Sequence, residues 1–94
     1  MIRSFRDRRT KSFYDGEYVS AFQGFAAQAE RRFAILDAAT SLLDLRALRS
    51  NRLEALRGDR EGQYSIRINQ QWRICFEWPE SSPGPENVEI VDYH

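Results

Sequence analysis

The spacing of hydrophobic residues changes from a helical period to a strand period about halfway along the chain. Six apolar side chains recur at helical spacing on one face: Phe22, Phe25, Ala26, Ala29, Phe33 and Leu36. Ser20, with Gln23 three residues later, has the spacing of a capping box at the start of this helix. From Asn51 onward apolar and polar residues alternate, which is typical of strands that bury one face. We therefore expect helices in the first half of the chain and a sheet in the second.

Turn residues divide the second half into four short strands. The segments "RLEAL", "QYSIRIN", "WRICFEW" and "NVEIVDY" are separated by "RGDREG", "NQQ" and the loop "PESSPGPEN". In the third strand Trp72 and Ile74 belong to the apolar face, so Arg73 points to the opposite side. Arg67 takes the matching position on the neighbouring strand. The alternation predicts an open sheet face that carries Arg67 and Arg73.

The first half adds shorter elements. "MIRSF" reads as a short strand, and "DRRTKSFYDG" as one or two helical turns between a capping Asp7 and a terminating Gly16. Ser41 and Asp44 form a second capping pattern at "SLLDL". The expected order β-α-α-β-β-β-β describes one α+β domain over residues 1–94, with two N-terminal helices packed on a mostly antiparallel sheet.

Composition narrows the class of protein. The chain of 94 residues fits one domain, and its 41% hydrophobic and 30% charged content is ordinary for a globular protein. No apolar run reaches membrane-spanning length, and Cys75, the single cysteine, excludes an internal disulfide and a cysteine-based zinc site. No nucleotide-binding or metalloprotease motif is present. We expect a cytoplasmic protein without a membrane partner, a cofactor or a metal.

The formal net charge of zero conceals an uneven distribution. Residues 46–73 carry seven arginines and three acidic residues, whereas residues 74–94 carry five acidic residues and no lysine or arginine. Lys11 is the only lysine in the chain. Arginine binds phosphate through two parallel hydrogen bonds and stacks on bases, so this bias fits an anionic partner. Solvated surface arginines would produce the same composition.

Three residues at the end of the sequence can each handle a proton. Histidine titrates near neutral pH, tyrosine donates or accepts a hydrogen bond, and aspartate orients an imidazole or removes a proton. These residues are Asp92, Tyr93 and His94. Alternatively, Tyr93 covers the edge of the core and His94 is a frayed end. Arg73 is a candidate to hold a phosphate whose charge grows during a reaction. Alternatively, its stem packs while its head stays in water or pairs with Glu77 or another acid.

Other side chains offer weaker candidates. Arg57 and Arg60 flank a "GD" turn, where they either clamp a nucleic-acid backbone or are simply solvated. The aromatic residues Tyr64, Trp72 and Trp78 could stack on bases, but their spacing in phase with the apolar face favours a core role. For Cys75, inert packing is preferred over a role as nucleophile.

Three stretches together resemble one family. "NRLEALRGDREGQYSIRINQQWRICFEW", the terminal "VEIVDYH" and the central "LDAATSLLDLR" are similar to the HigB toxins, the plasmid maintenance system killer branch of the RelE/ParE superfamily. The likeness covers nearly the whole chain and implies a RelE-like fold. It also implies a type II toxin that cuts messenger RNA in the ribosomal A site. Its expected partners are the ribosome and mRNA, a HigA-like helix-turn-helix antitoxin, and operator DNA through the antitoxin complex.

The resemblance also suggests roles for single residues. Arg73, Asp92, Tyr93 and His94 match positions that family members use in catalysis. The 2′-OH of RNA is its own nucleophile, so no metal is needed; Asp92 or Tyr93 would assist its deprotonation, Arg73 would neutralise the phosphate, and His94 would be the general acid. The candidates for RNA or ribosome contact are Arg52, Glu54, Arg57, Arg60 and Arg67.

Two of these positions depart from the family. Arg57 stands where relatives often have lysine, and Glu54 where some have a histidine that assists catalysis. A carboxylate at the second position is expected to repel RNA. Two alternatives share the fold: a ParE-like poison that binds gyrase, and an inactive module that only binds an antitoxin.

Overall fold

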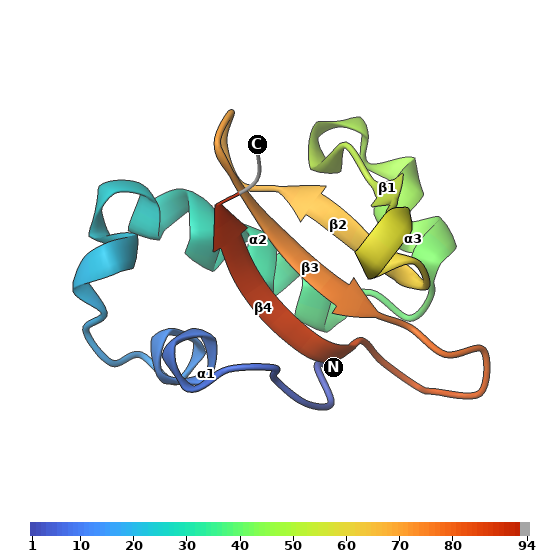
Figure 1. The fold of residues 1–94 in the computed structure, drawn as a ribbon, viewed down its shortest axis with the longest axis horizontal. Coiled ribbons are helices and arrows are strands. Elements are labelled where there is room, and N and C mark those ends of the chain that lie inside the picture. Colours follow the sequence, from blue (N-terminus) through green and yellow to red (C-terminus); the bar gives the residue numbers. More distant parts are fainter. Residues whose placement is uncertain (93–94) are drawn as a thin grey trace.

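An antiparallel sheet of four strands forms the second half of the chain in the computed structural model, which describes residues 1–92 (Figure 1). The strands are β1 (Glu54–Ala55), β2 (Gln63–Arg67), β3 (Trp72–Glu77) and β4 (Glu86–Asp92). Their order in the sheet is β1-β2-β3-β4, and each neighbouring pair is antiparallel. The side chain of Asn69 fixes the β2–β3 turn because its Oδ1 accepts from the backbone N–H groups of Gln71 and Trp72, both at 2.8 Å. The four predicted strands are confirmed.

Two of the predicted helix starts are also confirmed. Helix α1 (Arg8–Tyr14) begins after Asp7, whose carboxylate accepts from the Thr10 N–H, and Gly16 follows it at φ +93°. Helix α3 (Leu42–Ala47) begins after Ser41, whose hydroxyl accepts from the Asp44 N–H at 3.4 Å. Local side-chain chemistry therefore sets both starts.

The capping box predicted at Ser20 is wrong. Residues Ser20–Phe25 form a 3-10 helix, η1, and the α-helix α2 (Ala26–Ala38) begins only after it. Gln23 donates its side-chain N–H to the carbonyl of Val19 at 3.0 Å, so it does not cap Ser20. The non-helical backbone of Phe25, at φ −136°, separates η1 from α2. The buried helical face itself is confirmed.

The strand predicted at "MIRSF" is reduced to one parallel bridge, between Phe5 and Val88. Residues before and after this bridge still follow β4: the Arg6 N–H donates to the Val88 carbonyl at 2.9 Å, and the Val88 N–H donates to the Ser4 carbonyl at 3.1 Å. The segment cannot extend further as a strand because Asp7 already caps α1. Gly84 lies against the start of the chain, and a Cβ there would come within 2.0 Å of the Met1 carbonyl oxygen.

The core lies between the helices and one face of the sheet. In Figure 1, α2 passes behind the sheet, and α1 lies beside the edge strand β4. The Trp72 ring packs on Phe25 with ring centroids 4.8 Å apart and meets Phe22 edge-on at 6.0 Å. Tyr64 and Trp78 are partly buried against the same core. The core role predicted for these aromatic residues is confirmed.

Two further 3-10 segments flank β1: η2 (Arg49–Asn51) and η3 (Gly58–Arg60). Between them, β1 contributes only Glu54 and Ala55 to the sheet, paired with Ser65 and Tyr64. Over residues 1–92, no helix is long and apolar enough to cross a bilayer.

A half-buried carboxylate ties the first residues and α1 to α2. Asp37 accepts from the Ile2 N–H at 2.8 Å and from the Tyr14 hydroxyl. The hydrogen bond to Asp37 raises the pKa of Tyr14 to about 12, so this hydroxyl remains a donor throughout the physiological pH range.

We expect Asp37→Ala to lower the free energy of unfolding by about 1–3 kcal/mol, because it leaves two donors without their acceptor. Urea denaturation monitored by tryptophan fluorescence would measure this change. Asp59→Ala, which removes an exposed carboxylate in η3, is the matched control. Equal unfolding midpoints for the two variants would contradict the expectation.

Candidate active site

Arg73 lies in the middle of the sheet and is held on two sides. The residue is 9% exposed. Its Nε donates to the Ser65 hydroxyl on β2 at 2.7 Å, and its Nη2 donates to the carbonyl oxygen of Arg52 at 2.6 Å. The same Nη2 lies 3.0 Å from Oε1 of Glu54 on β1. The neighbouring chain segments therefore fix the orientation of the guanidinium before any ligand arrives.

The contact with the Arg52 carbonyl depends on an unusual backbone conformation. Arg52 has φ +47° and ψ +52°, the left-handed region that residues other than glycine seldom occupy. This conformation ends η2 and turns the chain into β1. It also directs the carbonyl to Arg73, so the strain falls beside a candidate functional residue.

Glu54 and Arg73 form a pair that joins β1 to β3. The Glu54 side chain is 56% exposed and that of Arg73 10%, so one member is open to solvent while the other is enclosed. The sequence predicts that this carboxylate repels RNA. The structure places it against the guanidinium, whose positive charge offsets part of that repulsion, and leaves more than half of the side chain exposed.

Arg67 is the cross-strand neighbour of Arg73. The two residues are register partners on β2 and β3, so their side chains leave the same face of the sheet, as the alternation predicted. Arg67 donates from Nε to the carbonyl of Asn69 at 3.1 Å. The expectation that this face is open is wrong, because Ser65 and Cys75 on it are fully buried.

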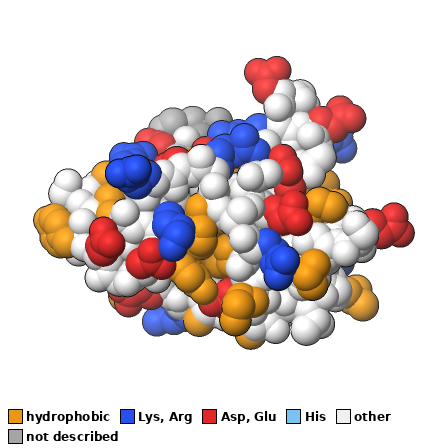
Figure 2. Space-filling model, turned by 90° about the horizontal axis from the view of Figure 1, so that it is seen from below, with side chains coloured by type: hydrophobic (Ala, Val, Ile, Leu, Met, Phe, Trp, Pro, Cys, Tyr) orange, Lys and Arg blue, Asp and Glu red, His pale blue; other side chains and the backbone are white. Residues whose placement is uncertain are grey.

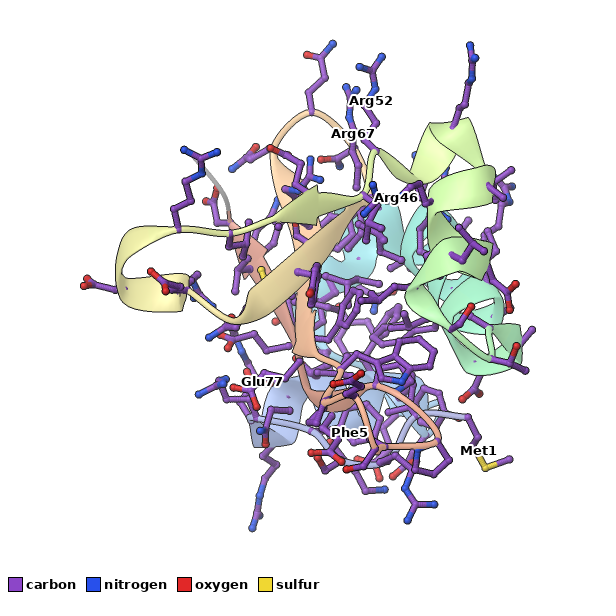
Figure 3. All side chains as sticks on the ribbon, turned by 90° about the vertical axis from the view of Figure 1, so that its right-hand side faces the viewer. Met1, Phe5, Arg46, Arg52, Arg67 and Glu77 are labelled. Atoms are coloured by element: carbon purple, nitrogen blue, oxygen red, sulfur yellow. The ribbon has the colours of Figure 1, made fainter. Side chains whose placement is uncertain are left out.

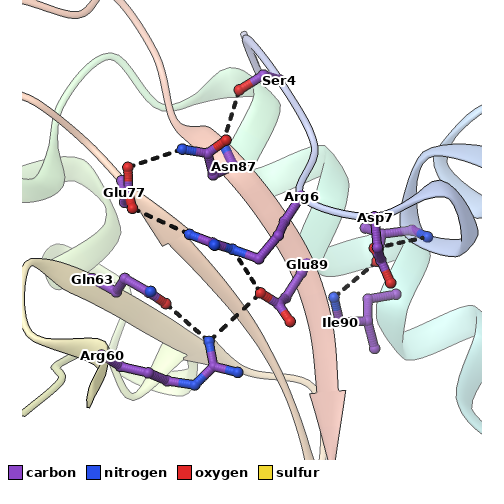
Figure 4. A network of polar contacts seen from close by, with 10 residues as sticks. Ser4, Arg6, Asp7, Arg60, Gln63, Glu77, Asn87, Glu89 and Ile90 are labelled. Atoms are coloured by element: carbon purple, nitrogen blue, oxygen red, sulfur yellow. Dashed lines mark hydrogen bonds and ion pairs between the residues drawn. The ribbon is translucent and has the colours of Figure 1, made fainter. Parts of the chain in front are cut away.

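A polar network covers this face beyond Arg73 (Figure 4). Arg6 bonds Glu77 at 3.2 Å and Glu89 at 2.8 Å. Asn87 donates to the other oxygen of Glu77 at 2.9 Å. These residues come from the N-terminal segment, β3 and β4. Their side chains enclose the sheet face that periodicity alone had left exposed.

Burial under this network explains the state of Cys75. Loss of solvent raises the pKa of its thiol to about 11. At neutral pH almost none of the thiolate form is present. The buried position confirms the predicted packing of this cysteine.

The two arginines of the β1–β2 connection lie in different surroundings. Arg60 donates to the Gln63 side chain at 3.0 Å and lies 3.6 Å from Glu89, so it belongs to the network of Figure 4. Arg57 is exposed. The Arg60 N–H donates to the Arg57 carbonyl at 3.3 Å, so the two residues share one turn, and their role as a clamp stays a prediction.

Asp92 ends β4 close to Arg73 in the sheet but on the other face. Its register partner is Trp72, whereas Arg73 is paired with Val91. The side chains of Asp92 and Arg73 consequently leave their strands in opposite directions. The Asp92 carboxylate accepts from the Gln71 side chain at 3.0 Å. Tyr93 and His94, the other two candidates of this terminus, lie outside the described residues.

Other surfaces are less suited to a polyanion. A hollow of about 380 Å³ between α1 and α2 has only Glu30 and Asp37 as charged lining residues. Figure 2 shows a face on which positive and negative side chains alternate around hydrophobic ones, without a continuous basic area. Across residues 1–92, no three His, Cys, Asp or Glu side chains are grouped as a metal site would require. The arginines around β1–β3 thus form the more positively charged surface.

Comparison with known proteins identifies the family of this chain. The family model described as "RelE-like toxin of type II toxin-antitoxin system HigB" matches residues 3–94. Toxin HigB-1 of Vibrio cholerae is 35% identical over 80 residues, covering 83% of this chain and 84% of that protein. Endoribonuclease HigB of Proteus vulgaris is 32% identical over 97 residues and covers both chains completely.

A solved structure supports the fold. The YoeB/ParE toxin from Agrobacterium tumefaciens superposes with a TM-score of 0.54 over 98% of both chains, at 16% sequence identity. The α+β architecture is therefore that of the RelE-like toxins. With the family match over residues 3–94, the chain belongs to the HigB-like toxins of type II toxin–antitoxin systems.

Proposed function

We propose that this toxin is a ribosome-dependent endoribonuclease that cuts messenger RNA. The observation that supports the proposal most directly is the Glu54–Arg73 pair, which places an exposed carboxylate 3.0 Å from an oriented guanidinium. A proton acceptor next to a phosphate-binding cation is what the cleavage of RNA requires. The name Endoribonuclease HigB of the Proteus vulgaris relative points to the same reaction.

The proposed reaction needs no nucleophile from the protein. The 2′-OH loses its proton to Glu54, and its oxygen forms a bond to the adjacent phosphorus. The bond from phosphorus to the 5′-oxygen breaks, and that oxygen takes a proton from His94. The products are a 2′,3′-cyclic phosphate and a free 5′-hydroxyl. Arg73 neutralises the charge that grows on the phosphate oxygens.

The candidate bases differ in the face of the sheet on which they lie relative to Arg73. Glu54 lies on the Arg73 side of the sheet, whereas the side chain of Asp92 leaves the opposite face. We therefore assign proton removal to Glu54. Asp92 would then orient the neighbouring groups, and Tyr93 is the alternative base.

Dependence on the ribosome is expected from the exposure of Glu54. Glu54 is more than half exposed, so the toxin alone does not enclose a flexible RNA strand. A messenger held in the ribosomal A site is already restrained, which removes much of the entropic cost of aligning the 2′-oxygen with the scissile bond. Translation inhibition in the cytoplasm is the expected cellular effect.

Two further partners belong to the proposal. A HigA-like antitoxin with a helix-turn-helix would bind this toxin and keep it inactive. The same antitoxin would carry the complex to operator DNA, because the helix-turn-helix is a DNA-reading motif.

The proposal is tested by adding the toxin to translating ribosomes and mapping messenger ends by primer extension. We expect cleavage only during translation. Arg73→Lys should cleave about 10²-fold more slowly, because lysine keeps the charge but loses the fork that contacts Ser65 and Arg52 together. Its ribosome binding, measured by co-sedimentation, should be unchanged.

Arg8→Lys, an exchange at an exposed position of α1, is the matched control and should cleave normally. Equal loss of cleavage and binding in Arg73→Lys would make Arg73 a docking residue. Intact messengers together with inhibited DNA supercoiling by gyrase would replace the proposed activity with that of a gyrase poison.

A further inference from the structure

A second hollow lies beside the Arg73 site and is lined by arginines. It has a volume of about 340 Å³. Its lining residues come from α2, η2 and the β2–β3 region: Arg32, Ser50, Arg52, Arg67, Ile68 and Asn69. An adjoining hollow of about 480 Å³ shares Ser50 and Arg52 with it and adds Arg49. We call the two together the arginine hollow.

The charge of the arginine hollow is unbalanced. Four guanidinium groups line it, and no carboxylate of residues 1–92 does. Within residues 1–92, none of these four arginines forms an ion pair. Burial, together with repulsion from Arg31, lowers the pKa of the Arg32 guanidinium below its ordinary value. A cluster of positive charges without counter-charges is stabilised by an anion.

Several of these groups are already oriented. Arg32 Nη1 donates to Asn51 Oδ1 at 2.8 Å and to the Ser50 hydroxyl at 3.3 Å. Arg67 is held by its bond to the Asn69 carbonyl at 3.1 Å. Figure 3 shows Arg52 and Arg67 extending from the same end of the molecule. Prior orientation lowers the entropic cost of binding, and planar guanidinium groups suit the oxygens of a phosphate.

Arg52 connects the hollow to the candidate active site. Its carbonyl accepts from Arg73, and its side chain lines the hollow. Arg67 is the register partner of Arg73 and lines the hollow as well. A polyanion that reaches Arg73 therefore passes next to this second group of cations.

We propose that the arginine hollow binds a backbone phosphate of RNA that flanks the phosphate held at Arg73. The hollow would thereby fix the register of the strand, while Glu54 and Arg73 act on the scissile position. The identification of the strand as a messenger rests on the proposed function, whereas the binding of a nucleic-acid phosphate does not.

The test measures binding of a fluorescent single-stranded oligonucleotide whose riboses are all 2′-O-methylated, which prevents cleavage. Arg52→Gln and Arg67→Gln should each weaken binding about five- to tenfold, since each removes one phosphate contact. Each should also reduce the slope of log Kd against log salt concentration by about 0.7. Arg8→Gln, which removes one exposed arginine from α1, should change the affinity less than about twofold.

A second arm compares inorganic phosphate with chloride at equal ionic strength. Phosphate should raise the melting temperature of the wild type more than that of Arg67→Gln, with each protein compared with itself in chloride. The proposal is overturned if Arg8→Gln weakens oligonucleotide binding as much as Arg67→Gln does. It is also overturned if stabilisation by inorganic phosphate requires these arginines but binding of the oligonucleotide does not. That result would indicate a site for free phosphate.

The result of the binding test does not depend on whether the toxin cleaves RNA. Oligonucleotide binding that depends on Arg52 and Arg67, with messengers left intact during translation, would support the phosphate site and refute the nuclease. If the toxin cleaves messengers but its oligonucleotide binding is unchanged in Arg52→Gln and Arg67→Gln, the nuclease would be supported and the phosphate site refuted.

Discussion

Glu54→Gln is expected to slow messenger cleavage by about 10²–10⁴-fold while ribosome binding stays within twofold of the wild type, about the loss that follows removal of a general base. The amide keeps the size of the side chain but cannot accept the proton of the 2′-OH. It also withdraws the negative charge that lies 3.0 Å from Nη2 of Arg73. Single-turnover cleavage on ribosomes carrying a defined codon would measure the chemical step apart from binding.

Two variants make this result specific. Glu54→His should retain cleavage within about tenfold of the wild type, because an imidazole also accepts a proton near neutral pH. Glu80→Gln removes an exposed carboxylate from the loop between β3 and β4 and should have no effect. Faster cleavage by Glu54→Gln would mean that this carboxylate competes with the phosphate for Arg73, and the role of base would then be wrong.

His94→Ala is expected to reduce cleavage by about 10²–10⁴-fold, because the leaving 5′-oxygen would depart without a proton. The sharpest measurement uses a messenger in which sulfur replaces that 5′-oxygen at the scissile phosphate. A thiolate is a good leaving group and needs no general acid. On this substrate His94→Ala and the wild type should cleave at similar rates.

The sulfur substrate separates two explanations for a slow variant. If His94→Ala is equally slow on both messengers, His94 acts in positioning or folding and is not the acid. Full activity of His94→Ala on the ordinary messenger would remove this residue from the mechanism. Circular dichroism spectra of the two proteins should coincide, which confirms that the variant is folded.

The sequence predicted the sheet because the strand pattern is local. Trp72 and Ile74 share one face and Arg73 takes the other, and only the period of two was needed to see this. The helix start at Ser41 was equally local. At Ser20 the same kind of pattern failed, because the chain forms a 3-10 helix up to Phe25 before α2 begins. A capping pattern does not reveal which type of helix follows it.

The parts of the site that sequence reasoning missed depend on distant segments. Arg6 and Glu77 are 71 residues apart, so the network that covers the second sheet face has no local signal. The contact between Glu54 and Arg73 required the register of β1 and the left-handed backbone of Arg52, which no hydrophobic period encodes. Sequence reasoning therefore predicted the direction of Arg73 correctly and allowed for an acidic partner, but it did not identify Glu54 as that partner.

The shortness of β1 has a consequence for how this toxin can be controlled. Glu54 and Ala55 are the register partners of β2, and Leu56 adds one backbone hydrogen bond to Gln63. Arg52 and Glu54 nevertheless supply the carbonyl and the carboxylate that hold Arg73. Opening such a short edge strand disrupts few backbone contacts, and of its neighbours Leu53 packs against the core while Leu56 is buried. A binding protein that displaces β1 from the sheet would inactivate the toxin without covering its active site. Release of β1 would restore the activity without refolding of the domain.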